Sequence, residues 1–328
     1  MENNLHRNNL NNIAYFPGCS LNSTAIDFNV STQKLFKLLE IKFEEIKDWN
    51  CCGTTPAHNI SDELSITLAA RNLLLAKKMG YDDIVCPCVS CYCKLLNASK
   101  YLNSNSELDK KNDMEMKNKV TSLLKDMGFD TAQFFNFRVY SIVEFLLIQK
   151  DKIKQKYLEL QNLLSPDVRT NAGTDLLKDL NPVCYYGCVL LRPRDIIKFD
   201  NVENPMSMEN ILNQVGINCL DFRFKTECCG AILSLTNKDI VLGLSKEILE
   251  AAVEAGANSI IVCCPLCQQN LDLRQVQINK SFKTNYKIPV FYITQILGLS
   301  LGLSIRDVMA DRLFVEPDIS GCKAKIKK

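Results

Sequence analysis

The sequence carries the same arrangement of cysteines twice. Each arrangement contains a single cysteine, an adjacent pair followed by glycine, and a C-x2-C motif, with spacings C-x31-CC-x35-C-x2-C and C-x39-CC-x34-C-x2-C. Ten of the sixteen cysteines belong to these sets: Cys19, Cys51, Cys52, Cys88 and Cys91, then Cys188, Cys228, Cys229, Cys264 and Cys267. Two ordered sets of five indicate an internal duplication, and each half has to bring its five thiols together.

The segments between these cysteines alternate between expected strands and expected helices. Apolar runs that end at glycine predict helices over residues 61–79 and 239–255, since Gly80 and Gly256 follow them. The remaining strands expected from the pattern are at 13–19, 43–49, 83–85, 183–186, 217–222 and 258–262. The remaining helices are expected at 31–39, from the first C-x2-C motif through Leu96, and at 139–147, 150–164 and 208–215. This order predicts an α/β fold with two pseudo-symmetric domains, each a short parallel sheet with flanking helices.

The polar stretches set the expected domain limits. We expect a disordered tail over residues 1–12 and a first domain over 13–165, with a charged helical insertion at 103–164. A polar linker at 166–182 then leads to a second domain over 183–328.

Composition excludes several classes of protein. The formal net charge of +2 gives no electrostatic footprint for nucleic acid. The polar N-terminal stretch has no apolar core of an export signal, so we expect a cytoplasmic protein. Clustered cysteines in a reducing compartment point to metal or redox chemistry rather than to disulfides. Because the only histidines are His6 and His58, the ligands are expected to be thiolates.

The segment 288–305 is almost uncharged. A spanning helix needs about 20 strongly apolar residues, and this segment is shorter and contains Pro289. We therefore expect a core strand followed by a partly buried helix. A peripheral membrane contact or a contact with another subunit is the second interpretation.

The adjacent cysteine pairs indicate a metal group with several atoms. Neighbouring side chains of an extended backbone point to opposite sides, so a tight turn is needed to bring both thiols to one place. Gly53 and Gly230 supply the conformational freedom for that turn. Structural zinc takes four ligands, one fewer than each set offers, and an all-thiolate zinc site stays open as the alternative.

Six cysteines lie outside the two sets. Cys86, Cys93 and Cys263 stand beside expected ligands and could replace one of them. Cys184, Cys219 and Cys322 are expected to have no metal role, and the first two have the apolar surroundings of small buried residues.

The duplicated pattern resembles that of the cysteine-rich CCG domain proteins, and among them the B-type subunit of heterodisulfide reductase. The matching stretches are Tyr186-Gly187-Cys188, Leu68-Ala69-Ala70-Arg71-Asn72-Leu73, Cys264-Pro265-Leu266-Cys267 and the Leu/Gly/Ser run at 297–304. The resemblance covers residues 13–100 and 183–310, and the charged insertion lies outside it.

The resemblance implies a non-cubane 4Fe–4S cluster in each repeat, held by the five cysteines named above for that half. It also implies that the two halves face each other with the substrate disulfide between the clusters. A disulfide takes two electrons, and two one-electron centres can supply them.

One residue departs from the family pattern. In the archaeal methanogen members that the chain resembles, the first cysteine of the second repeat lies in a Gly-Cys-His sequence. Here Val189 takes the place of the histidine. Arg192 and Arg194 are candidates for binding an anionic substrate, and His58 is a candidate proton donor. An ordinary solvated loop is the alternative explanation for all three.

The resemblance implies a catalytic, cytoplasmic subunit that reduces a disulfide such as the coenzyme M–coenzyme B heterodisulfide. Because no G-x-G-x-x-G fingerprint follows a strand, electrons are expected from an iron–sulfur subunit and a flavoprotein subunit of the same complex. The alternative is an electron-transfer or membrane-attachment subunit of a fumarate reductase, succinate dehydrogenase or sulfur-oxidising complex that exchanges electrons with quinone. Val189 and the apolar segment 288–305 favour this alternative, and the segment is also a candidate subunit interface.

Overall fold

The computed structural model describes residues 10–54, 57–103, 111–163, 176–192, 194 and 196–317. The chain forms two compact units. Unit 1 contains residues 1–24 and 40–145, and unit 2 contains residues 25–39 and 146–328. These two units are defined by contacts between residues. The expected domains 13–165 and 183–328 are defined by the sequence repeat and remain a prediction. The expected tail lies partly outside the described residues, but Leu10 is buried and Asn12 begins a strand.

Unit 1 is built on a parallel sheet of four short strands. They are β1 (Asn12–Tyr15), β2 (Lys42–Glu45), β3 (Asp83–Cys86) and β4 (Arg138–Ser141). Their order is β2-β1-β3-β4, and every neighbouring pair is parallel. Parallel neighbours require crossover connections, which explains why helical stretches separate the strands in the sequence.

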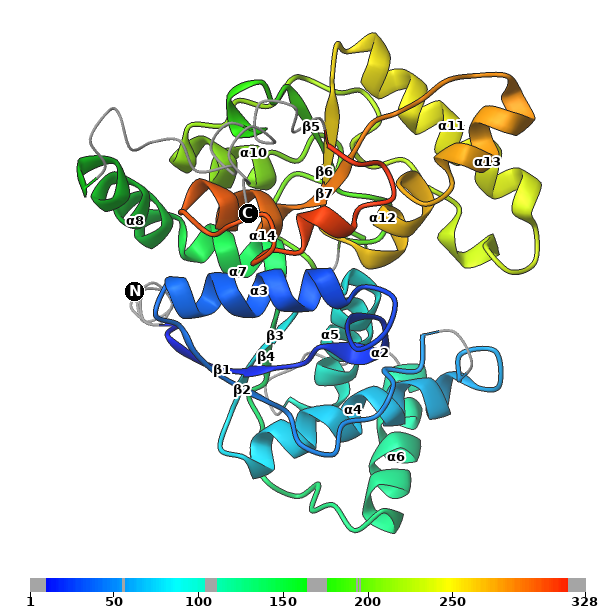
Figure 1. The fold of residues 1–328 in the computed structure, drawn as a ribbon. Helices are drawn as coiled ribbons and strands as arrows, with labels where there is room; N and C mark the ends of the chain where they lie inside the picture. Colours follow the sequence, from blue (N-terminus) through cyan, green and yellow to red (C-terminus); the bar gives the residue numbers. More distant parts are fainter. Residues whose placement is uncertain are drawn as a thin grey trace. The chain divides into compact units, whose positions relative to one another are not determined.

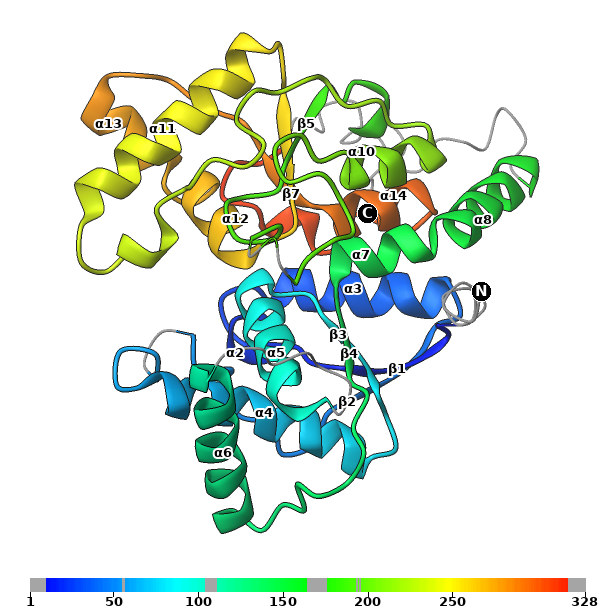
Figure 2. The same cartoon turned by 180° about the vertical axis from the view of Figure 1, so that it is seen from behind.

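The helices of unit 1 are α2 (Gly18–Leu21), α4 (Asp62–Lys78), α5 (Val89–Leu102) and α6 (Lys111–Asp126). The helix expected over 61–79 is α4, which begins where the Ser61 hydroxyl accepts the Leu64 N–H at 3.0 Å and ends before Gly80. Helices α4, α5 and α6 pack against one another (Figure 2). The charged insertion, expected to be helical, contributes α6 to this group.

Unit 2 repeats the arrangement with three strands. These are β5 (Pro182–Tyr185), β6 (Ser259–Val262) and β7 (Val290–Tyr292), parallel and in the order β5-β6-β7 (Figure 1). A single parallel bridge between Val183 and Leu220 stands where β2 stands in unit 1. The fold expected from the sequence, two α/β repeats with short parallel sheets, is therefore confirmed.

The elements that follow β4 complete the chain. The unit division falls within α7 (Ile142–Ile148), and the others belong to unit 2: α8 (Lys150–Leu163), α10 (Ser207–Leu212), η1 (Asn213–Val215), η2 (Ala231–Leu233), α11 (Lys238–Glu254), α12 (Pro265–Leu271), α13 (Gln275–Phe282), α14 (Ile293–Ser300) and η3 (Ala310–Arg312).

One helix from the first half of the sequence packs with the second unit. Helix α3 (Ile26–Leu38) contacts α14, and the two lie side by side in Figure 1. The hydroxyls of Ser31 and Thr294 are 2.8 Å apart and buried, and the rings of Phe28 and Tyr292 stack with centroids 4.1 Å apart. The sequence predicted this helix but not its packing partner.

The uncharged segment near the C-terminus forms β7 and α14. Every residue from Val290 to Ser300 is buried, so the expected core strand and helix are confirmed, and the helix is buried on all sides. The side chains of residues 290–300 pack inside the chain, whereas residues 302–304 are not buried, and a subunit contact of this segment remains a prediction. Within the described residues, no helix combines the length and apolarity needed to cross a bilayer.

We predict that Phe28→Ala lowers the free energy of unfolding of unit 2 by about 3–5 kcal/mol, because it removes a buried ring and leaves a cavity between α3 and α14. Chemical denaturation under anaerobic conditions measures this loss. Ile26→Ala on the same helix is the control, since Ile26 is 39% exposed. Equal losses in the two variants would contradict the packing of α3 described here.

Candidate metal centres

The cysteines stand beyond the carboxyl ends of the parallel strands. In unit 1, β1 leads to Cys19 in α2, β2 leads to the Cys51–Cys52 pair, and β3 leads to Cys88, the residue before α5. Carboxyl ends of parallel strands meet at one edge of a sheet, where loops gather side chains from distant parts of the sequence. The local fold therefore collects thiols that lie up to 72 positions apart.

In unit 1 the five predicted thiols form a connected chain of contacts. Cys19 is hydrogen-bonded to Cys51, Cys51 to Cys52, Cys52 to Cys91, and Cys91 to Cys88. All members of the first set are therefore brought together by the structure.

The second set gathers in unit 2 as two hydrogen-bonded subsets, and Cys188 of one interacts electrostatically with Cys229 of the other. Cys188 is hydrogen-bonded to Cys228, and Cys267 to both Cys229 and Cys264. The sulfur atoms of Cys229 and Cys267 are 3.6 Å apart. The cysteines of each expected set therefore lie in the same unit, and their role as ligands is taken up below as a proposal.

The glycine after each adjacent pair has the predicted left-handed conformation, with φ of 81° at Gly53 and 75° at Gly230. A residue with a β-carbon adopts this conformation only at a cost. The turn it allows places both thiols of the pair on the same group. It also directs backbone N–H groups at sulfur, as in the 3.3 Å contact from Gly230 N to Cys228 Sγ.

Each group has a buried side and an open side. In unit 1, Cys52, Cys88 and Cys91 are buried, whereas Cys51 is half-buried and Cys19 is exposed. Unit 2 repeats the pattern: its buried members are Cys229, Cys264 and Cys267, and the half-buried ones are Cys188 and Cys228. An external molecule can therefore approach each group where the first cysteine and the first member of the pair lie.

The thiols of each group hold their protons unequally. The hydrogen bond from Cys19 lowers the pKa of Cys51 to about 2, and the hydrogen bond to Cys51 raises the pKa of Cys52 to about 12. In unit 2, the hydrogen bond from Cys267 lowers the pKa of Cys229 to about 7, while burial raises the pKa of Cys188 to about 12. Five thiolates so close together repel one another, so full ionisation requires a bound cationic group.

Other side chains contact these sulfur atoms and were missed by the sequence reasoning. The Thr54 hydroxyl lies 3.2 Å from Cys52 Sγ. In unit 2, the Asn270 amide donates to the Cys229 carbonyl at 3.0 Å and approaches Cys229 Sγ at 3.6 Å. The contact of Thr54 could have been suspected from its position beside the cysteine pair. For Asn270, the only indication in the sequence is that it lies one helical turn after Cys267.

The donor set fits an iron–sulfur group. Every donor of each five-membered group is a soft thiol, and soft sulfur ligands select zinc, copper(I) and iron–sulfur clusters. In unit 1 the thiols follow one another in a chain of contacts, which suits a group ligated at several of its atoms. Among the residues that the structure describes, no three His, Cys, Asp or Glu side chains have the arrangement that one bound metal ion requires.

The cysteines outside the two sets fall into different situations. Cys86 is buried and hydrogen-bonded to Cys91, so it is a sixth thiol at the first group. Cys263 is buried and its thiol faces the Tyr186 carbonyl at 3.8 Å. Cys93 is half-buried in α5, and Cys322 lies outside the described residues.

The three candidate polar residues lie on the surface. The His58 imidazole is about half exposed and pairs with Asp62 at 3.0 Å, while its backbone N–H donates to the Gly53 carbonyl at 3.2 Å. Arg194 is exposed and pairs with Glu203, and Arg192 is exposed on the turn after Cys188. Their functional roles remain predictions.

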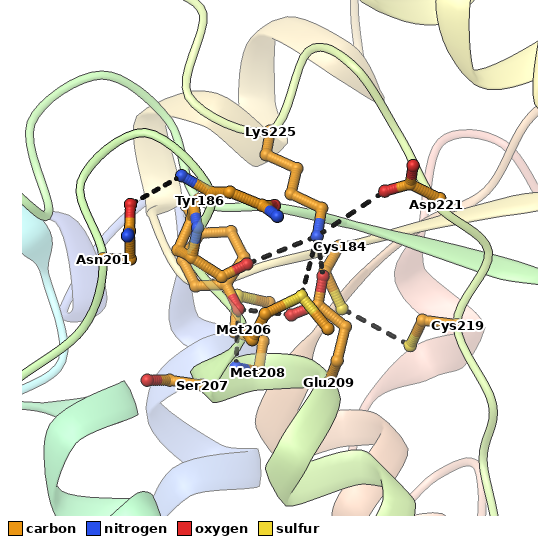
Figure 3. A network of polar contacts seen from close by, with 12 residues as sticks. Cys184, Tyr186, Asn201, Met206, Ser207, Met208, Glu209, Cys219, Asp221 and Lys225 are labelled. Carbon is orange, nitrogen blue, oxygen red and sulfur yellow. Dashed lines mark hydrogen bonds and ion pairs between the residues drawn. The ribbon is translucent and has the colours of Figure 1, made fainter.

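A buried ion pair supports the turn that carries Cys188. Lys225 Nζ lies 2.9 Å from Glu209 Oε1, and both side chains are about 95% buried. The Tyr186 hydroxyl donates to the other oxygen of Glu209 and accepts the Met208 N–H at 2.7 Å (Figure 3). The Lys225 carbonyl accepts the N–H groups of Tyr186 and Gly187 at 2.8 and 3.1 Å. The network therefore connects α10 and the segment before Cys228 to the turn before Cys188.

Comparisons with known proteins agree with the repeat. A family model described as "CCG: Cysteine-rich domain" matches residues 13–96 and 183–272, together more than half of the chain. The chain is 27% identical to the 8-methylmenaquinol:fumarate reductase membrane anchor subunit of Wolinella succinogenes, covering 90% of this chain and 94% of that protein. It is 28% identical to the B-type subunit of the ferredoxin:CoB-CoM heterodisulfide reductase of Methanosarcina mazei, covering 90% and 91%.

One solved structure is similar in fold. A hypothetical protein from Helicobacter pylori superposes with a TM-score of 0.64 at 15% identity, over 93% of this chain. The match spans about half of that protein, 52% of its chain. At this identity the likeness concerns the fold alone.

We predict that Lys225→Met lowers the free energy of unfolding by about 3–5 kcal/mol, because it leaves the Glu209 carboxylate buried without its cation. The double variant Lys225→Met with Glu209→Gln should recover a large part of this loss, since no buried charge remains. Lys246→Met, which breaks the partly exposed pair with Glu250, should have little effect, because water can solvate the carboxylate that is left. A double variant less stable than both single variants would contradict this account.

If both thiol groups hold iron, as proposed below, we predict that Gly18→Ala removes about half of it, because metal binding needs every ligand in place. A β-carbon at residue 18 would lie 2.8 Å from Cys91 Sγ. Gly128→Ala is the matched control, since Gly128 also has a positive φ but nothing lies within 4 Å of the added carbon. Iron and acid-labile sulfide per chain are the measurements. The same iron content in both variants would contradict the proximity of residue 18 to the metal group.

Proposed function

Because the chain belongs to the CCG family of cysteine-rich domain proteins, we propose that it is the iron–sulfur subunit of a heterodisulfide reductase-like complex. In this proposal two non-cubane 4Fe–4S clusters reduce a disulfide such as the coenzyme M–coenzyme B heterodisulfide. The observation that carries the proposal is the gathering of five thiols in each unit. The Methanosarcina mazei relative, a named heterodisulfide reductase subunit similar over nine-tenths of both chains, supports it.

The proposed ligands divide by unit. The first group would be held by Cys19, Cys51, Cys52, Cys88 and Cys91, and the second by Cys188, Cys228, Cys229, Cys264 and Cys267. When bound, such clusters take up and release single electrons. Reduction of R–S–S–R′ consumes two electrons and two protons and gives R–SH and R′–SH, so two one-electron groups match the reaction.

The protein's own residues would control access and protons. The open side of each group, at Cys19 and at Cys188, is where a substrate sulfur can approach. Arg192 and Arg194 follow Cys188 and could bind a carboxylate or phosphate of the substrate, with Arg194 first leaving Glu203. His58 lies next to Asp62 near the first pair and could supply a proton to a leaving thiolate.

Electrons would come from other subunits. The curated relatives are subunits of reductases, and partner subunits for this chain are consistent with that. We propose an iron–sulfur electron-transfer subunit linked to a flavoprotein subunit. The complex would be cytoplasmic or peripheral at the inner face of the membrane.

The second candidate function is electron exchange with quinone. The relative from Wolinella succinogenes, which is a menaquinol:fumarate reductase subunit, is the observation that favours it. Val189, which stands where a histidine is expected for disulfide reduction, is 40% exposed beside Cys188. In this case the two clusters would relay electrons to or from a quinone of the membrane.

The proposal predicts that anaerobically purified, pre-reduced protein releases thiols from the coenzyme M–coenzyme B heterodisulfide. Two thiols should appear for each two electrons lost by the clusters. Free thiols are counted against cluster oxidation followed by absorbance. Oxidation of the clusters by a quinone analogue, with no thiol release from the heterodisulfide, would contradict the leading proposal and favour the second.

The ligand assignment predicts that Cys52→Ala and Cys229→Ala each yield soluble protein with one damaged and one intact centre, because the two sets lie in separate units. Electron paramagnetic resonance of the two variants should show complementary losses. Cys322→Ala, outside both sets, is the control. Two intact centres in either ligand variant would overturn the assignment.

A further inference from the structure

Two cysteines that belong to neither set face each other in unit 2. The thiol of Cys184 contacts that of Cys219, with the sulfur atoms 3.4 Å apart (Figure 3). Cys184 lies in β5 and is fully buried, whereas Cys219 is half-buried. Each is the chain neighbour of a residue of the Val183–Leu220 bridge, so both side chains project from the same face of the strand pair.

The equivalent position in unit 1 contains no thiol. Counted from Gly18 and Gly187, Val183 corresponds to Ala14, and Ala14 pairs with Glu44 as Val183 pairs with Leu220. Cys184 and Cys219 therefore correspond to Tyr15 and Phe43. These two rings pack edge to face with centroids 5.7 Å apart. The fold accepts apolar rings at this place, so it does not itself require two sulfur atoms in contact.

The two thiols differ in access. Burial and the hydrogen bond with Cys219 raise the pKa of Cys184 well above that of a free thiol. Cys184 is therefore a protonated, inaccessible thiol, while Cys219 can meet a small reagent from solvent. A half-buried thiol with a fully buried thiol in contact behind it is the arrangement of an attacking and a resolving cysteine.

We propose that Cys184 and Cys219 form a reversible disulfide when the protein meets a hydroperoxide. The Cys219 thiolate attacks one oxygen of the peroxide, the O–O bond breaks, and Cys219 becomes a sulfenic acid while water or an alcohol leaves. The Cys184 sulfur then displaces the hydroxyl of the sulfenic acid, and its proton leaves with that hydroxyl as water. Overall, two thiols and one hydrogen peroxide give one disulfide and two waters.

The geometry requires only a small movement. A disulfide bond is about 2.05 Å long, so the sulfur atoms must approach by about 1.4 Å. Cys219 lies between η1 and the single bridge at Leu220, outside any named strand or helix, so its backbone is not held on both sides by a ladder. Cys184 is fixed in β5, and Cys219 is the partner that moves.

The disulfide would link the two chain segments that lead to the second group of thiols. Strand β5 leads through Tyr186 to Cys188, and the stretch after Cys219 leads through Lys225 to Cys228. A disulfide joins these two segments beside the buried ion pair. As a disulfide, Cys219 can be reduced again by other thiols. A sulfenic acid without a partner thiol is oxidised further to sulfinic acid.

The test treats the anaerobically purified holoprotein with hydrogen peroxide, blocks free thiols with N-ethylmaleimide and maps the peptides by mass spectrometry. The expected product joins Cys184 to Cys219, disappears after dithiothreitol, and forms at least about tenfold faster in the folded protein than in urea, because the fold supplies a high effective concentration. Cluster iron is measured in parallel.

The variants separate this disulfide from random oxidation. In Cys184→Ala, Cys219 should accumulate as sulfinic acid that dithiothreitol does not reverse, and in Cys219→Ala no linked peptide should form. Cys93→Ala, another half-buried cysteine outside both sets, should leave the Cys184–Cys219 link unchanged. The proposal is overturned if wild-type Cys219 stays unmodified, becomes sulfinic acid directly, links to a different cysteine, or links to Cys184 equally fast in the unfolded chain.

Discussion

Two adjacent cysteines have to direct their thiols to the same group, and the structure of both units depends on this requirement. Side chains of neighbouring residues normally diverge, and a left-handed glycine after the pair removes the conflict, with φ of 81° at Gly53 and 75° at Gly230. The remaining thiols come from the ends of parallel strands, which share an edge of the sheet. The short sheets therefore serve mainly to collect loops that carry cysteine.

The same scaffold is elaborated differently in the two units. The first group has a sixth thiol, Cys86, and a hydroxyl at Cys52, whereas the second has an amide at Cys229 and the buried Lys225–Glu209 pair nearby. Hydrogen bonds to sulfur and local burial set the potential of iron–sulfur groups. The duplication therefore gives two similar thiol groups with different surroundings, which suits two centres that exchange electrons in sequence.

The features that could be predicted from the sequence are those that depend on local pattern. The spacing of the cysteines, the glycine at each pair and the apolar periods of α4 and α11 are all short-range, and the structure has them where the pattern predicts them. Helix α3 packs in unit 2 through contacts with Tyr292 and Thr294, which are more than 260 positions away in the sequence. No local pattern predicts contacts at that separation. The Lys225–Glu209 pair, whose members are 16 positions apart, was also missed, because no sequence pattern indicates that these two charges meet.

The contact between Cys184 and Cys219 shows the limit of considering residues singly. Each has the sequence context of a small buried residue, and only the parallel bridge between their neighbours brings the two sulfur atoms together. The roles of His58, Arg192 and Arg194 illustrate the converse. Their sequence positions suggested chemistry, and the structure shows exposed side chains, with His58 and Arg194 held by acidic neighbours.

The central claim is that each group of five thiols holds an iron–sulfur cluster. Its most direct test is the content of iron, acid-labile sulfide and zinc in anaerobically purified protein. The account predicts about eight iron and about eight sulfide per chain, from two clusters of the 4Fe–4S type, with zinc far below one per chain. Zinc at about one or two per chain without acid-labile sulfide would contradict it and would make the two groups structural zinc sites.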